Sequence, residues 1–320
     1  MLGAGPGFGG TVPGRLIDRR GTPAQPAGVP RSQTGGPHVR DTRILAYLLL
    51  LPATVYLLVF FVFPFVQVGI TAFAGPDGFT LRNVNAMVRD WRFLPAFGNT
   101  LTLVVIIVPL QLVLALTMAT LVTRLGAGRD IVLYVWSIPL GISDLASGLI
   151  FLAIFNQSGF LNSFLHGLGL IDQPVNWLSY RNTGFLIFAV VIAELWRSTA
   201  IVMVILVAGL GLIPKAYYEA AEVFGAGPWQ RFIKITLPLL RPSLQTALIL
   251  RTILALEVFA VVQAIAGTNL PTLLGETYNW QFNLQDGPVA SALALVTLVI
   301  SVAATVAFLW LLRTPEEVRA

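Results

Sequence analysis

Hydrophobic residues recur along the chain from Ile44 onward in long runs, and polar segments separate these runs. Each run has enough residues to cross a hydrocarbon core of about 30 Å as a helix. The predicted fold class is therefore an all-α membrane protein with six transmembrane helices, over residues 44–70, 99–122, 131–155, 184–212, 244–266 and 289–312. Prolines inside the runs are tolerated in membrane helices and mark expected kinks, at Pro52, Pro64, Pro109 and Pro139.

The two ends of the chain do not share this pattern. Residues 1–43 are rich in Gly, Pro and Arg and predict a disordered tail, and residues 313–320 predict a short C-terminal tail. The apolar run that follows the first tail is too long for the h-region of a signal peptide, which has roughly 7 to 15 residues. Residues 44–312 are therefore expected to form one transmembrane domain.

Composition favours a membrane protein over a soluble one. The chain is 56% hydrophobic and 11% charged, whereas soluble domains are about half apolar and about one-quarter charged. The chain has no cysteine, which excludes disulfides and cysteine nucleophiles. Its two histidines, His38 and His166, cannot form a metal site by themselves, so no metal is expected.

The positions of the 20 Lys and Arg residues predict the orientation, because cytoplasmic loops are enriched in them. Six lie in the first tail, two in the second connection, four in the fourth and two at the C-terminus, which makes fourteen. Four lie in the other connections, and two lie inside spans. Both termini are therefore predicted to be cytoplasmic in a multi-pass protein of the inner membrane. This distribution also explains the net charge of +5 without a nucleic-acid partner.

The connection over residues 213–242 is the longer of the two predicted cytoplasmic links, and it is patterned. Pro214 suits a helix start, where its missing amide hydrogen costs nothing. Glu219 and Glu222 then share one helix face, and Gly225 stands where a helix ends in the left-handed conformation.

A second short helix is predicted after this glycine elbow. Pro228 can open it, and Pro238 is expected to stop it. Physical reasoning alone leaves two interpretations of such an element: an amphipathic helix that rests on the membrane surface, or a docking element for a soluble partner.

A resemblance favours the docking interpretation. Three parts of this segment, at fixed spacing, resemble the EAA loop of ABC importer permeases: Glu219-Ala220-Ala221, Gly225-Ala226, and Ile235-Thr236-Leu237-Pro238 followed by Pro242. The string from Gly225 to Leu240 is similar to the maltose-type, carbohydrate-importing branch. Further matches at Asn99-Thr100-Leu101, Trp196-Arg197 and Ala208-Gly209-Leu210 extend the resemblance over most of residues 44–312.

The resemblance implies a type I ABC importer permease fold with a cytoplasmic coupling helix. It further implies that Glu219 makes the polar contact to an ATP-binding subunit, that Ala220 and Ala221 permit close approach, and that Gly225 forms the elbow. The position before this glycine is commonly Asp in the family but is Phe224 here, which puts a polar contact at that position in doubt.

The resemblance also implies partners and a substrate. The partners would be a second homologous permease subunit, two ATP-binding subunits that hold ATP and Mg, and an extracytoplasmic sugar-binding protein. The connections at residues 71–98 and 267–288 are expected to receive the binding protein. The substrate would be a sugar, of the di- or oligosaccharide class, or glycerol phosphate in its place.

Polar residues inside the predicted spans are candidates for the translocation path, because ionisable groups are costly in lipid. The candidates are Asp144, Glu194, Arg197, Glu257 and Gln263. Two alternatives remain open. Glu194 and Arg197, three residues apart, can form an internal ion pair that stabilises the bundle, and Glu257 can pair with Arg251 or with another subunit.

Motifs of enzymes are missing. Residues 209–215 lack the glycine before the lysine and the following Ser or Thr of a phosphate-binding loop, and neither a His-Glu-x-x-His nor a Gly-x-Ser-x-Gly motif occurs. The chain is therefore predicted to be a transport subunit without a cofactor of its own. Two other classes remain as alternatives: a secondary transporter driven by a gradient, and a membrane enzyme that handles lipid-linked sugars.

Overall fold

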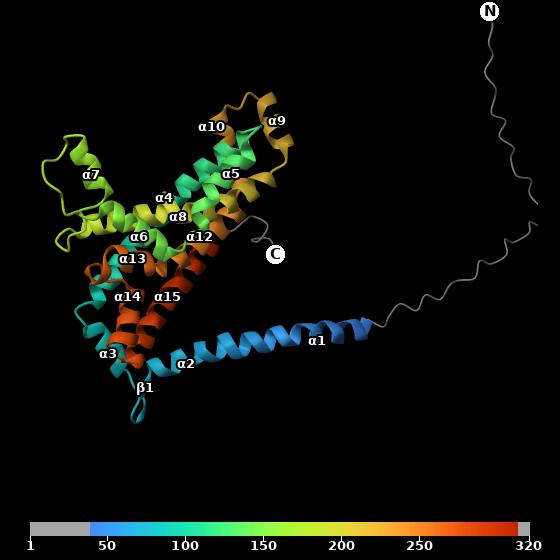
Figure 1. Cartoon of the computed structure of the whole chain (residues 1–320). Coiled ribbons are helices and arrows are strands. Elements are labelled where there is room, and N and C mark those ends of the chain that lie inside the picture. The colour runs from blue at the N-terminus through green and yellow to red at the C-terminus, as the bar shows by residue number, and fades with distance from the viewer. Residues whose placement is uncertain (1–38, 313–320) are drawn as a thin grey trace, which may run out of the picture. The chain divides into compact units, whose positions relative to one another are not determined.

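The structure is a computed structural model that describes residues 39–312 (Figure 1). The predictions for residues 1–38 and 313–320 lie outside the described residues. A boundary between Val59 and Phe60 divides the chain into two compact units.

The first unit contains helix α1, Val39–Leu57. It starts before residue 44, so the prediction of disorder up to residue 43 is wrong for residues 39–43, where neither Gly nor Pro interrupts the helix. The helix continues through Pro52 into a π-helical segment, Leu58–Val62, which crosses the boundary between the units. Helix α2, Phe63–Ala72, follows, with Pro64 in its first turn, where no amide hydrogen is needed.

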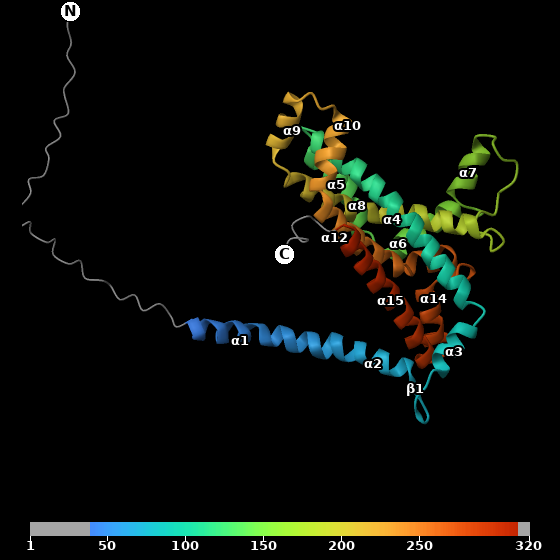
Figure 2. The same ribbon diagram turned by 180° about the vertical axis from the view of Figure 1, so that it is seen from behind.

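Three long helices form the centre of the second unit: α4 (Phe93–Arg124), α8 (Thr183–Gly211) and α12 (Arg241–Leu256). Each of them packs against the other two. Helix α15 (Gly287–Leu311) packs against α2, α12 and α14 (Leu273–Tyr278), and α6 (Asp144–Phe155) packs against α13 (Ala260–Ile265). Helices far apart along the chain, such as α4 and α12, are therefore neighbours in space, as both ribbon views show (Figures 1 and 2).

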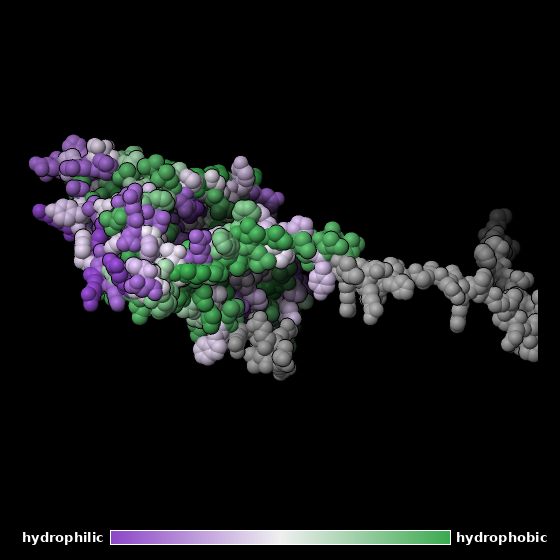
Figure 3. Space-filling view, turned by 90° about the horizontal axis from the view of Figure 1, so that it is seen from below, coloured by the Kyte–Doolittle hydropathy of each residue, from purple (hydrophilic) through white to green (hydrophobic). Residues whose placement is uncertain are grey.

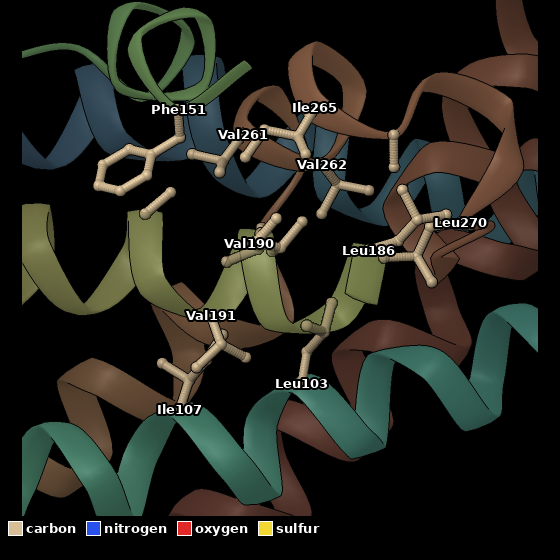
Figure 4. Packing of buried hydrophobic residues seen from close by; sticks show 14 of the residues in the cluster. Leu103, Ile107, Phe151, Leu186, Val190, Val191, Val261, Val262, Ile265 and Leu270 are labelled. Carbon is tan, nitrogen blue, oxygen red and sulfur yellow. The ribbon is translucent and has the colours of Figure 1, made fainter. Parts of the chain in front are cut away.

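The largest core cluster joins α4, α6, α8 and α13 (Figure 4). Small residues let these helices approach closely, as is common in membranes. A Cβ added to Gly148 of α6 would lie 2.6 Å from the Ala264 Cβ of α13. A Cβ added to Gly209 of α8 would lie 2.6 Å from the Ser243 Cβ of α12.

Among the described residues, five helical segments are long and apolar enough to cross a membrane: Leu45–Ala72, Phe93–Arg124, Asp144–Gly167, Thr183–Gly211 and Gly287–Leu311. A bent pair, Pro228–Leu239 and Arg241–Leu256 with a 68° angle, brings the number to six if it counts as one span. The structure thus has five or six candidate spans against the six predicted, and it divides two of the predicted spans differently.

The predicted span over residues 131–155 is broken near its middle. Helix α5, Arg129–Ser137, leads into a 3-10 turn, Ile138–Gly141, and α6 begins at Asp144. The Ser143 hydroxyl accepts a hydrogen bond from the Ala146 amide and caps the new helix. The break contains Pro139, so the kink expected at this proline is confirmed, whereas α4 continues through Pro109.

The connections hold short elements that the hydrophobic pattern did not predict. Strands β1 (Ala74–Gly75) and β2 (Gly78–Phe79) form a hairpin, which is a small departure from an all-α fold. The other elements in the connections are α3 (Arg82–Arg89), α7 (Phe160–Gly167), a 3-10 turn at Gly267–Asn269 and a π turn at Asn279–Asn283. Buried Asn162 holds the connection after α7, because its side chain bonds to the backbone of Gln157 and Val175 and to the Trp177 indole.

The surface of the second unit is divided by hydropathy. On the face shown in Figure 3, hydrophilic side chains gather at one end, and hydrophobic side chains cover much of the remainder. Apolar side chains are also exposed along α4 and α15, such as Val105, Val113, Val299 and Val306. Such a surface suits contact with lipid or with other membrane helices.

Candidate coupling loop and intramembrane polar site

The segment between α8 and α12 folds as two short helical pieces around a glycine. Helix α9, Lys215–Val223, ends at Phe224, and Gly225 follows with a φ of +73°. The Ala226 amide donates to the Ala221 carbonyl and the Gly225 amide to the Glu222 carbonyl, each at 2.9 Å. These two bonds define a Schellman motif, which requires the left-handed conformation predicted for Gly225.

The second piece differs from its prediction. It starts at Pro228 as α10 (Pro228–Arg231), passes through a π-helical turn (Phe232–Thr236) and continues as α11 (Leu237–Leu239). This piece ends at Leu239, one residue after Pro238, so the stop predicted at this proline is confirmed to within one residue. The chain then bends by 68° before α12.

Contacts between the two pieces hold the loop together. Glu222 of α9 forms an ion pair with Arg231 of α10. The Tyr218 hydroxyl lies 3.0 Å from the Thr236 hydroxyl, within hydrogen-bond distance. The loop therefore has a defined shape of its own.

Residues 39–312 leave the outer face of α9 largely uncovered. Glu219 and Ala220 are exposed, and Ala221 is half-buried. At the tip, Val223 and Phe224 are 85% and 88% exposed. An exposed apolar tip beside an acidic side chain has the character of a docking surface rather than of a solvated loop.

A second polar site lies inside the bundle, where α4, α8 and α12 meet. The Glu194 carboxylate of α8 forms an ion pair with Arg251 of α12 at 2.6 Å, and both side chains are almost fully buried. Gln111 of α4 accepts a hydrogen bond from the Arg251 Nε and donates to the Glu194 carbonyl at 2.8 Å. Ser198 donates to the same carboxylate at 3.2 Å. These groups form a partnered charge network.

Arg197 extends this network toward the surface. It lies 3.8 Å from Glu194, the i, i+3 pair that the spacing predicted, but its closer partner is Asp144 at 2.7 Å. Asp144 begins α6 and is half exposed. Two arginines thus face two carboxylates, and the network carries no net charge.

Glu257 and Gln263 are separated from this network and from each other. The predicted helix over residues 244–266 is interrupted after Leu256, so the prediction that the two residues share one helix is wrong. Glu257 lies directly after the end of α12. A helix that ends inside a bundle leaves backbone carbonyl groups without helical partners at this point. The pairing of Glu257 with Arg251 is also wrong, because Arg251 bonds to Glu194 and Gln111.

Glu257 lines a cavity of about 600 Å³ between α12, α14 and α15. Three hydroxyls on one face of α15 share this cavity: Thr297, Ser301 and Thr305. Each donates to the carbonyl four residues earlier, which leaves its oxygen available to accept. The cavity therefore combines apolar walls with a carboxylate and a row of hydroxyls. The sequence pointed to Glu257 alone, although the i, i+4 spacing of the hydroxyls is visible in it.

Gln263 lies beside a different, small cavity of about 40 Å³, together with Arg92 and Glu276. Arg92 and Glu276 form an ion pair at 3.0 Å that ties the start of α4 to α14. Burial raises the pKa of Glu276 above its ordinary value, and the Arg92 charge opposes this shift without cancelling it. Neither residue was a candidate from the sequence, because both lie in connections rather than in apolar runs.

A bundle of apolar helices with polar side chains in its interior and a braced, exposed loop between two spans defines a multi-pass membrane protein of the transport class. The chain belongs to the family described as the inner membrane component of binding-protein-dependent transport systems, whose sequence profile matches residues 111–314. This membership confirms the resemblance, the multi-pass inner-membrane location and a role as a transport subunit rather than an enzyme.

Known proteins agree with this assignment. The chain is 33% identical over 279 residues to the trehalose/maltose transport system permease protein MalF of Thermococcus litoralis, covering 83% of this chain and 92% of the relative. It is also 33% identical over 291 residues to the sulfoquinovosyl glycerol transport system permease protein SmoG of Agrobacterium fabrum, covering 86% and 92%.

Solved structures share the fold. The chain superimposes with a TM-score of 0.74 and 22% identity on a chain of a bacterial ABC transporter that imports the acidic polysaccharide alginate, covering 85% of this chain and 96% of that one. A second structure of an alginate transporter, in complex with a pentasaccharide-bound periplasmic protein, gives a TM-score of 0.71. The predicted permease fold is therefore confirmed.

Proposed function

We propose that the chain is one permease subunit of an ATP-driven importer that moves a neutral di- or oligosaccharide into the cytoplasm by alternating access. The observation that carries this proposal is the cavity at Glu257, which offers a carboxylate and hydroxyls beside apolar walls in a member of a transport family. Carboxylates accept hydrogen bonds from sugar hydroxyls, and apolar walls suit the C–H faces of the rings. The trehalose/maltose relative supports the substrate class.

The charge balance favours a neutral sugar over an acidic one. Arg197 and Arg251, the two arginines deep in the described spans, are both paired with carboxylates of the chain itself. The remaining charge near the cavity is the carboxylate of Glu257. An anionic substrate would meet repulsion there, because like charges in a low-dielectric site repel strongly.

The partners follow from the exposed α9 tip. In the proposed complex, α9 and Gly225 lie in a groove of a cytoplasmic ATP-binding subunit, with Glu219 as the polar contact and Val223 and Phe224 as apolar contacts. A second, homologous permease completes the path, and two ATP-binding subunits supply ATP and Mg. An extracytoplasmic sugar-binding protein delivers the substrate at the opposite end.

The orientation can be tested on its own, because the chain has no cysteine. Phe224→Cys and Trp91→Cys each place one thiol at a strongly exposed position. With both termini cytoplasmic, a membrane-impermeant maleimide added to intact cells labels Trp91→Cys and leaves Phe224→Cys unlabelled until the membrane is opened. The reverse labelling pattern contradicts the proposed orientation.

The function is tested by uptake into proteoliposomes that hold the purified complex. We expect uptake of labelled maltose or trehalose to require ATP and to persist when ionophores dissipate the proton and sodium gradients. Glu257→Gln should reduce uptake, whereas the matched change Asp172→Asn, at an exposed position, should not. Uptake that ignores ATP and stops with the ionophores would support a secondary transporter instead. Preferred uptake of glycerol phosphate would contradict the neutral-sugar assignment.

A further inference from the structure

A cavity of about 560 Å³ lies behind the loop, where α4 and α8 end and where α5, α9 and α10 begin. Figures 1 and 2 both show α5, α9 and α10 at the same end of this unit. This cavity shares no lining residue with the Glu257 cavity or with the charge network around Glu194. Four basic side chains line it: Arg124, Arg129, Lys215 and Arg231.

The charge of this cavity is largely uncompensated. Among the described residues, ion pairs are formed by Arg231, with Glu222, but not by Arg124, Arg129 or Lys215. The Arg231 Nε is buried and has no hydrogen-bond partner. The nearest other acid in the sequence is Asp130, which follows Arg129 and does not line the cavity.

Hydroxyl groups complete the lining of the cavity. Thr120 and Thr123 of α4 and Tyr218 and Thr236 of the loop contribute these hydroxyls. The Thr120 and Thr123 hydroxyls donate to the Thr117 and Thr120 carbonyls, and Tyr218 and Thr236 bond to each other. The donors that face a ligand are therefore the guanidinium and ammonium groups, which bind phosphate oxygens. A buried guanidinium nitrogen without a partner is a donor that such a ligand can satisfy.

Apolar side chains are exposed on elements that meet at this end of the unit (Figure 1). Ile131, Tyr134 and Ile138 are strongly exposed at helical spacing along α5 and the turn that follows. Leu121 of α4 and Leu212, just after α8, are also exposed, and both are next in sequence to residues that line the cavity. A basic cavity next to apolar helix faces has the two-part chemistry of a lipid site, with a charged headgroup and acyl chains.

We infer that this basic cavity binds a phosphate group, carried either by the headgroup of an acidic phospholipid or by a soluble phosphate ion. The apolar faces beside it favour the phospholipid. In the proposed orientation the cavity faces the cytoplasmic leaflet. Its occupant would contact Lys215 at the start of α9, so it would fix the base of the coupling loop.

The test is native mass spectrometry of the full-length chain, delipidated in mild detergent and then titrated with phosphatidylglycerol. The variant Arg129→Gln plus Lys215→Gln removes two cavity cations and spares Arg231, which braces the loop. The matched control Arg82→Gln plus Arg89→Gln removes two cations from α3, away from the cavity. Equal thermal midpoints show that the variants are folded.

We expect the cavity variant to bind phosphatidylglycerol at least about tenfold more weakly, since each cation near a headgroup contributes substantially. The control should change binding by less than about twofold. Equal losses in both variants, or no loss in either, would overturn the inference. If the double variant does not fold, the comparison of Arg129→Lys with Arg129→Gln replaces it, and only the second should lose binding.

Two further arms identify the source of the phosphate group. Binding of phosphatidylglycerol that resists inorganic phosphate assigns the site to the lipid. Phosphate binding that displaces the lipid assigns it to the soluble ion. Phosphatidylcholine, which has no net charge, should bind equally weakly to wild type and variant. Because none of these arms needs a transport partner, their failure leaves the proposed permease function standing.

Discussion

The loop around Gly225 and the network around Glu194 use the same residue types in opposite surroundings. Glu194 is 1% exposed, bonds to Arg251 and Ser198, and lies 3.8 Å from Arg197. Glu219 is exposed, and so is the apolar tip of its helix, which the described residues leave largely uncovered. A buried carboxylate must be satisfied within the fold, whereas an exposed one beside an apolar tip is available to a partner. We therefore expect the network to stabilise the helix bundle, and the loop to bind a partner subunit.

The largest expected effect comes from breaking the network. Glu194→Leu leaves Arg251 as an unpaired buried charge, so we expect a loss of about 3–5 kcal/mol in the free energy of unfolding. Denaturant unfolding in mild detergent measures this loss. Adding Arg251→Met should restore most of it, because the buried charge is then gone as well. The control Glu222→Leu breaks an exposed ion pair, and it should lower the free energy of unfolding by less than about 1 kcal/mol. An equal loss for Glu194→Leu and Glu222→Leu would contradict the role of burial.

A smaller effect is expected from the packing that surrounds the network. Gly148→Ala places a methyl group 2.6 Å from the Ala264 Cβ and 3.1 Å from the Val261 Cα, so we expect a loss of about 1–3 kcal/mol. Gly98→Ala lies in α4 with no atom within 4 Å, and should raise stability by about 0.5–1 kcal/mol. Thermal midpoints of the two variants should therefore move in opposite directions. Midpoints that both rise would contradict the close approach of α6 and α13.

In the loop, a glycine matters for its conformation rather than for space. Gly225→Ala forces an alanine into the left-handed region, at a cost of about 1–2 kcal/mol. Because the strain is local, hydrogen exchange should quicken at the Ala226 amide while exchange in α8 stays unchanged. Gly227→Ala, at a position where φ is −68°, should change hydrogen exchange neither at the Ala226 amide nor in α8. Faster exchange throughout the bundle would show that the loop is not an independent unit.

The smallest effect concerns Glu276, which is buried like Glu194 but lies outside both of these regions. Because its native pKa is raised, the native state holds the proton at pH values where the unfolded chain has lost it. The free energy of unfolding should therefore fall as the pH rises from about 4.5 through the raised pKa, and then level off. Glu276→Gln should flatten this dependence, and Arg92→Gln should steepen it. Stability that rises over this range in wild type would contradict the direction of the shift.

The sequence predicts the parts of this fold that depend on hydrophobicity and backbone chemistry. Long apolar runs predict the spans, and Gly225 predicts the helix end, because few other residues tolerate its conformation. The division of residues 244–266 at Glu257 was missed, since periodicity does not show where a helix ends inside a bundle. The π turn at Phe232–Thr236 was also missed, because the sequence pattern does not distinguish it from an α-helical turn.

The polar site was only partly predictable for a similar reason. Its ionisable members are visible as charges within apolar runs, but their pairing depends on which helices meet. The i, i+3 spacing suggested Glu194 and Arg197, whereas Arg251, which lies far along the chain, provides the shorter bond. Gln111 carries no charge and therefore gave no signal, although it links α4 to both partners of the buried pair.

The most direct test of the proposed role of the loop is a site-specific cross-link in membranes that contain the assembled transporter. Phe224→Cys offers a single thiol at the tip of α9, and Trp91→Cys offers an equally exposed thiol elsewhere. With a short thiol-reactive photo-cross-linker, we expect Phe224→Cys to give an adduct that mass spectrometry identifies as an ATP-binding subunit, and Trp91→Cys to give none with that subunit. An assembled, transport-competent complex in which Phe224→Cys never reaches that subunit would contradict the coupling role of this loop.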